Sequence, residues 1–76
     1  MQFERISIDP GVMLGKPGIK GTRITVELIL DKLAGGVSLE WVLDAYQNIK
    51  REDVLEALRY AKAVLANEEI IEATPA

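Results

Sequence analysis

Cysteine and histidine are both absent from the 76 residues of this chain. The missing cysteines exclude disulfide staples and thiolate chemistry, and the missing histidines remove the commonest metal ligand and the usual general base near neutral pH. We therefore expect no metal site, no cofactor and no enzymatic activity. A core of this size supplies only about 3–5 kcal/mol of stability. Without disulfides, we expect a homodimer or a higher homo-oligomer.

Long apolar runs are also absent. No stretch approaches the roughly 20 residues that span a bilayer, and the N-terminal segment 1–5 lacks the layout of a signal peptide. These observations predict a cytoplasmic protein without membrane contact. The net charge of −3 is unevenly spread, because residues 1–25 carry +2 and residues 26–76 carry −5. This split favours different partners for the two halves. The alternative interpretation is that the acidic surface only keeps the protein in solution.

The N-terminal third has the pattern of a strand followed by a loop. Apolar and polar residues alternate over residues 3–8, which predicts a half-buried strand, and Asp9-Pro10-Gly11 ends it with turn residues. Residues 11–22 are glycine-rich and predict a loop. Residues 23–25 are predicted to form a second short strand that pairs with the first.

Three helices are predicted after this region from apolar residues at helical spacing. Thr25 and Ser38 are predicted N-caps, Gly35-Gly36 ends the first helix, and the third helix begins near Arg51. The expected apolar stripe of the third helix consists of Val54, Leu55, Leu58, Ala61 and Leu65, widened by Ala57 and Val64. The predicted fold is a mainly α, three-helix, homeodomain-like (helix-turn-helix) domain with a short N-terminal β-strand or β-hairpin.

These elements form one domain over residues 1–76. We divide it into a strand pair with a glycine-rich loop (1–25), a three-helix bundle (26–66) and a tail (67–76).

The glycine-rich loop carries Lys16, Lys20 and Arg23 within eight residues. The spacing excludes a phosphate-binding P-loop, which needs four residues between its glycines and then Gly-Lys-Ser/Thr at the start of a helix. Two interpretations remain open for the three cations. They are either contacts for an anion such as a DNA phosphate or ordinary solvated charges.

The third helix offers Arg51 and Arg59 as further DNA contacts. Glu52, Asp53 and Glu56 are interleaved with them in the sequence, and carboxylates that face phosphates lower affinity. We therefore expect this helix to be a poor phosphate binder by itself. DNA binding would need two protomers and the basic loop.

Trp41 lies off the apolar stripe of the second helix, so we expect it to be partly exposed and to contact a protein partner, together with Ile70 and Ile71. Packing under the N-terminal strand is the competing interpretation for Trp41.

Motifs spread over residues 5–65 resemble one bacterial family. Gly15-Lys16-Pro17 followed by Gly21-Thr22-Arg23-Ile24 is similar to the signature of domain of unknown function 433. The second half agrees at Leu33-Ala34-Gly35-Gly36 and at Glu52-Asp53-Val54. The sequence departs from the family at Leu14, where the family usually has glycine, and at Gln47, where it usually has proline.

The resemblance implies a homeodomain-like fold and an antitoxin of a type II toxin–antitoxin pair, which dimerises, binds its own promoter and occludes a PIN-like ribonuclease toxin with its C-terminal part. This inference is at the level of fold and family. The alternative is a homodimeric protein-interaction module without nucleic-acid binding.

Overall fold

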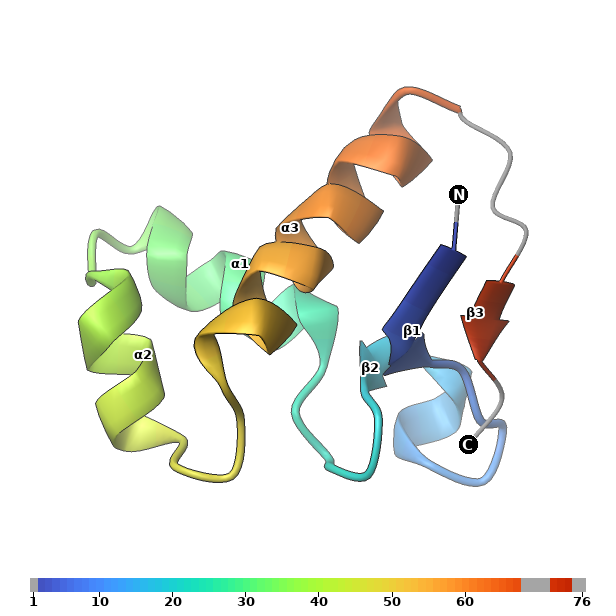
Figure 1. Cartoon of the computed structure of the whole chain (residues 1–76), viewed down its shortest axis with the longest axis horizontal. Helices are drawn as coiled ribbons and strands as arrows, with labels where there is room; N and C mark the ends of the chain where they lie inside the picture. The colour runs from blue at the N-terminus through green and yellow to red at the C-terminus, as the bar shows by residue number, and fades with distance from the viewer. Residues whose placement is uncertain (1, 68–71, 75–76) are drawn as a thin grey trace.

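A computed structural model describes residues 2–67 and 72–74 of the chain. In chain order the elements are β1 (Gln2–Ser7), the single turn η1 (Met13–Gly15), β2 (Gly18–Ile19), α1 (Val26–Ala34), α2 (Leu39–Ala45), α3 (Arg51–Leu65) and β3 (Glu72–Thr74). In Figure 1, α3 lies between α2 at one end and the strands at the other. The predicted mainly α, three-helix domain with an N-terminal antiparallel strand pair is confirmed.

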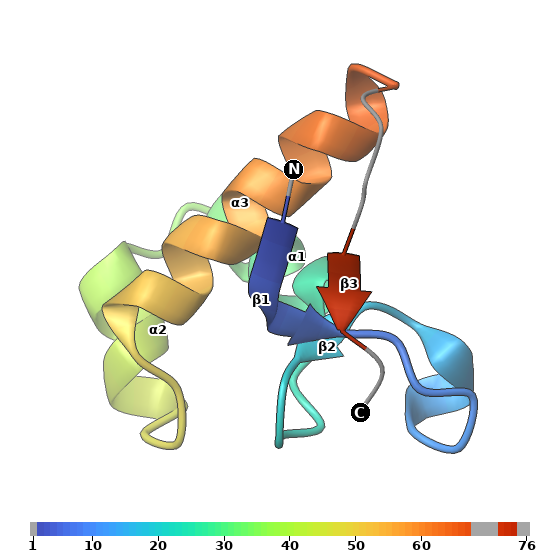
Figure 2. The same ribbon diagram turned by 45° about the vertical axis from the view of Figure 1, so that its right-hand side comes forward.

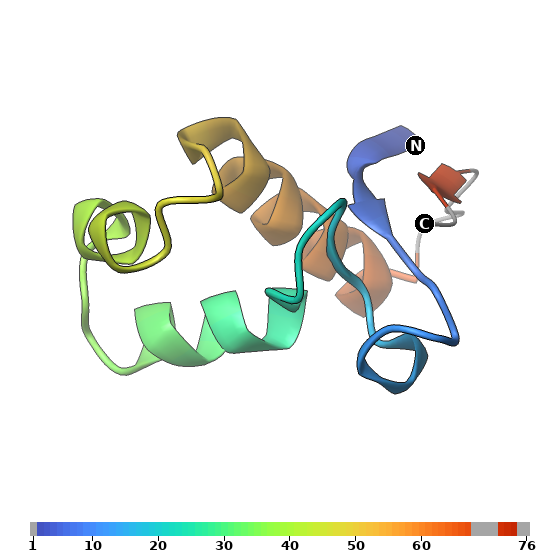
Figure 3. The ribbon, with the colours of Figure 1, turned by 90° about the horizontal axis from the view of Figure 1, so that it is seen from below.

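Short polar side chains start the first two helices, as the sequence predicts. The Thr25 hydroxyl accepts a hydrogen bond from Leu28 N at 3.0 Å, and the Ser38 hydroxyl accepts one from Trp41 N at 3.0 Å. Gly36, with φ +97°, provides the left-handed residue that ends α1 at little steric cost. The chain then turns sharply, so that α2 is seen almost end-on in Figure 3, where α1 lies across the view.

The strands form one sheet in the order β2-β1-β3, and its second strand is not where the sequence pattern placed it. Ile6 of β1 pairs antiparallel with Ile19 of β2, whereas residues 23–25 do not pair with β1. The reason is a tight turn in which Thr22 N donates to Ile19 O at 3.0 Å and Gly21 has φ +80°, as a type II turn requires. This turn brings Ile24 back against β2, where Ile19 N donates to Ile24 O at 2.8 Å.

The buried face of α3 also differs from the predicted stripe. Leu55, Leu58, Val64 and Leu65 are exposed. The side chains that face inward are Asp53, Val54, Ala57, Tyr60 and Ala63. The reason is that α3 packs against β1 as well as α1, and the ring of Tyr60 meets that of Phe3 edge-on with centroids 5.3 Å apart. Burial raises the pKa of the Tyr60 hydroxyl.

The predicted tail contains a strand. β3 pairs in parallel with β1, with Phe3 opposite Ala73, so that β1 becomes the central strand of the sheet. Figure 2 shows β3 alongside β1. Alternation over three residues is too short a signal to predict this pairing, because it depends on the position of β1. No helix in residues 2–67 is long and apolar enough to cross a membrane.

The loop between β1 and β2 holds a leucine in an unfavourable conformation. Leu14 has φ +59° and ψ +29°, is 93% exposed, and occupies the position at which the resembled family usually has glycine. A left-handed conformation costs an L-residue about 1–2 kcal/mol.

Because of that cost, Leu14→Gly is expected to raise the free energy of unfolding by about 1 kcal/mol, measured as an increase in the urea midpoint at an unchanged m-value. Leu14→Ala is the matched control, since alanine keeps the backbone penalty and loses only an exposed side chain. Equal midpoints for the two variants would show that the conformation is not strained.

Candidate nucleic-acid interface

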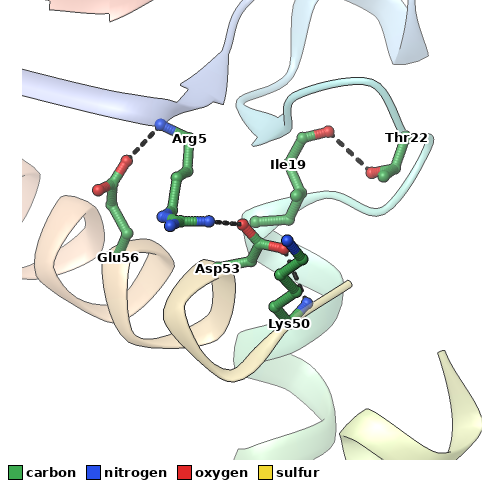
Figure 4. A network of polar contacts seen from close by, with 6 residues as sticks. All are labelled: Arg5, Ile19, Thr22, Lys50, Asp53 and Glu56. Carbon is green, nitrogen blue, oxygen red and sulfur yellow. Dashed lines mark hydrogen bonds and ion pairs between the residues drawn. The ribbon is translucent and has the colours of Figure 1, made fainter. Parts of the chain in front are cut away.

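Arg5 and Asp53 connect β1 to the start of α3. Arg5 Nη1 donates to Asp53 Oδ1 at 3.0 Å, and this hydrogen bond raises the pKa of the Arg5 guanidinium. Asp53 Oδ2 accepts a hydrogen bond from Lys50 N at 2.8 Å, which satisfies a free backbone donor ahead of the helix. The backbone N–H of Arg5 donates to the carboxylate of Glu56. Figure 4 shows these contacts on the side of α3 that faces β1.

In this network, two of the three carboxylates of α3, those of Asp53 and Glu56, accept hydrogen bonds from other parts of the chain. Asp53 is 8% exposed, and Glu56 is directed at the backbone of β1. Asp53 and Glu56 therefore contact β1 and the start of the helix, although they are interleaved with the cations in the sequence. The expectation that α3 by itself is a poor phosphate binder stays a prediction. Only Glu52 is an exposed acidic residue of α3.

The solvent side of α3, which we call the outer face, combines cations with leucines. Its exposed residues recur at helical spacing and are Arg51, Glu52, Leu55, Leu58, Arg59, Lys62 and Leu65. Arg59 has no acidic partner within residues 2–67 and 72–74, whereas Arg51 donates to Glu40 of α2 at 2.8 Å and lowers the pKa of that carboxyl. Both members of this pair are largely exposed. Surface pairs of this kind contribute little to stability, because both side chains stay hydrated.

The three loop cations have different surroundings. Lys16 Nζ lies 2.9 Å from Glu27 Oε1, so its charge is balanced by α1. Lys20 and Arg23 are exposed and have no acidic partner in the described part of the chain. They belong to the turn that the Thr22 hydroxyl fixes by donating to Ile19 O and accepting from Ile24 N. Lys16 thus differs from Lys20 and Arg23, because its charge is balanced by an ion pair.

Of the predicted protein contacts, Trp41 is 47% exposed, which agrees with its predicted partial exposure. Ile70 and Ile71 lie outside the described residues.

A shallow apolar groove runs between α1 and α3, and Leu30, Tyr60 and Val64 are among its lining residues. This groove follows from the position of Tyr60 on the inner side of α3, which the predicted stripe omitted.

Sequence reasoning missed Arg5 and Asp53 as organising residues, because they are 48 positions apart and no local pattern connects them. The only available signal was an acidic residue in the first turn of a helix, which by itself indicates only a favourable interaction with the helix dipole.

Within residues 2–67 and 72–74, no cluster of acidic side chains could hold a metal ion.

The family suggested by the sequence motifs is supported by a direct comparison. A family model matches residues 6–61, which include the end of β1, β2, α1, α2 and most of α3. No curated protein and no solved structure matches significantly. The chain belongs to the family described as protein of unknown function (DUF433).

Proposed function

We propose that this protein is a non-enzymatic binding module that contacts the DNA backbone through the outer face of α3 and the turn at residues 20–23. The observation that carries the proposal is the withdrawal of Asp53 and Glu56 from that face by contacts with Arg5. The exposed cations of the outer face then meet a phosphate backbone with only Glu52 as an opposing charge on the same helix. Electrostatic contacts of this kind supply most of the non-specific affinity for DNA.

The biological setting that we propose comes from the family resemblance. In that setting the protein is a cytoplasmic, homodimeric antitoxin of a type II pair, which binds its own promoter and a PIN-like ribonuclease toxin. The exposed side chain of Trp41 supports a protein contact on α2.

The test is the affinity for duplex DNA from upstream of the gene, measured by fluorescence anisotropy over a range of salt concentrations. The double variant Arg51→Gln/Arg59→Gln is expected to bind about tenfold more weakly and to reduce the salt slope by about 2, because each phosphate contact contributes about 0.9. Lys32→Gln, which removes a cation from α1, is the control and should change the slope by much less. Equal slopes for the wild-type protein and the double variant would contradict the proposal.

A homodimeric protein-interaction module is the second candidate. The leucines on the outer face of α3, Leu55, Leu58 and Leu65, favour it, because exposed apolar side chains in a row often mark a protein contact. Under this alternative the duplex does not bind at moderate salt, and sedimentation shows a dimer that Leu58→Glu dissociates.

A further inference from the structure

A hollow between three loops lies at the end of the molecule where α3 begins. Its volume is about 500 Å³, and its lining residues come from the end of β1, the loop before η1, the turn after β2 and the loop between α2 and α3. They are Ser7, Val12, Gly21, Thr22, Arg23 and Asn48. All three loops reach the lower side of the molecule in Figures 1 and 2.

The chemistry of the lining is that of an anion site. Arg23 supplies a guanidinium without an acidic partner in the described part of the chain, and Ser7 and Asn48 supply a hydroxyl and an amide that can donate hydrogen bonds. No lining residue is acidic. Asp9, on the same loop as Val12, accepts a hydrogen bond from Gly11 N at 2.9 Å.

The walls of the hollow are fixed before any ligand binds. On one side, the Thr22 hydroxyl closes the turn that carries Arg23, with bonds of 2.8 and 3.0 Å to Ile19 O and Ile24 N. On the other side, Asp53 holds Lys50 N, and Ile49 N donates to Tyr46 O at 3.2 Å across the loop that contains Asn48. The backbone positions of Arg23 and Asn48 are therefore set in advance, and only their side chains lose conformational freedom on binding.

We propose that this hollow binds a phosphate group. A carboxylate offers two acceptor oxygens, whereas a phosphate offers three or more, which suits a bidentate guanidinium together with a hydroxyl and an amide. The group belongs either to a DNA backbone or to a small phosphorylated ligand. If the phosphate belongs to DNA, this proposal rests on the proposed function. If it belongs to a small ligand, the proposal is independent of that function.

The experiment follows the backbone amide signals of Gly21, Thr22 and Asn48 by NMR while inorganic phosphate replaces chloride at constant ionic strength. The wild-type chain is expected to show saturable shifts. Asn48→Asp places a carboxylate in the hollow with little change of shape and should weaken phosphate binding about tenfold or more, as should Arg23→Gln. The matched control is Gln47→Glu, which adds the same charge on the same loop at a residue that does not line the hollow.

The two sources are separated by repeating the DNA titration with Asn48→Asp. Weaker DNA binding together with weaker phosphate binding identifies the ligand as a nucleic-acid backbone. Unchanged DNA binding, or no DNA binding by any variant, together with saturable phosphate shifts assigns the hollow to a small phosphorylated ligand. Shifts that do not saturate, or equal losses in Asn48→Asp and Gln47→Glu, would overturn the proposal even if DNA binds to α3.

Discussion

Phe3→Ala is expected to lower the free energy of unfolding by about 3–5 kcal/mol, the usual cost of removing a buried phenylalanine side chain. Phe3 is 1% exposed and is the β1 side chain that meets Tyr60 of α3 edge-on. The core of a chain of 76 residues supplies only about 3–5 kcal/mol of stability. The variant should therefore be partly unfolded at room temperature, which urea titration followed by far-UV circular dichroism will show.

Phe3→Leu is the control for this substitution. Leucine refills most of the space, so its cost should stay below about 2 kcal/mol and should reflect mainly the lost ring contact. If Phe3→Ala unfolds at the same urea concentration as the wild-type chain, β1 does not form part of the core.

The second large effect is expected at Asp53. Asp53→Ala removes the acceptor of the Arg5 guanidinium and of the Lys50 backbone N–H. The Arg5 side chain is 41% exposed, so water can replace its lost contact, and the main cost is the loss of the helix cap, about 1–2 kcal/mol. The same urea titration measures this loss.

Glu52→Ala provides the matched comparison, because Glu52 is the neighbouring carboxylate and is exposed. Its removal should change stability by less than about 0.5 kcal/mol. Asp53→Asn keeps an acceptor for Lys50 N and removes the charge beside Arg5, so it should fall between the two. A cost for Asp53→Ala no larger than that for Glu52→Ala would remove Asp53 from the connection between β1 and α3.

The parts of the fold that were predictable are those set by neighbours in the sequence. Thr25, Ser38 and Gly36 act on backbone groups within a few residues, so their local chemistry determines where helices start and end. The face of α3 was not predictable in this way. Both Leu58 and Tyr60 suit a core, and only the position of β1 against the helix places Tyr60 inside.

The candidate site likewise has parts that the sequence predicts and parts that depend on residues far apart in the chain. Arg23 and Arg59 are recognisable as exposed cations from the sequence, whereas the charge balance around them depends on distant pairs. Arg5 withdraws two carboxylates from the outer face of α3, and Glu27 neutralises Lys16. The hollow was not predictable, because Ser7, Arg23 and Asn48 come together only when three loops meet.

The parallel pairing of β3 with β1 has a consequence for how the chain folds. It joins Phe3 to Ala73, so it closes a loop of nearly the whole polypeptide, and the entropic cost of this closure grows with the length enclosed. The helices form through contacts between near neighbours and need no such closure. We therefore expect the C-terminal strand to form last. Once formed, it covers an edge of β1 whose unpaired amides and carbonyls would otherwise be a template for aggregation.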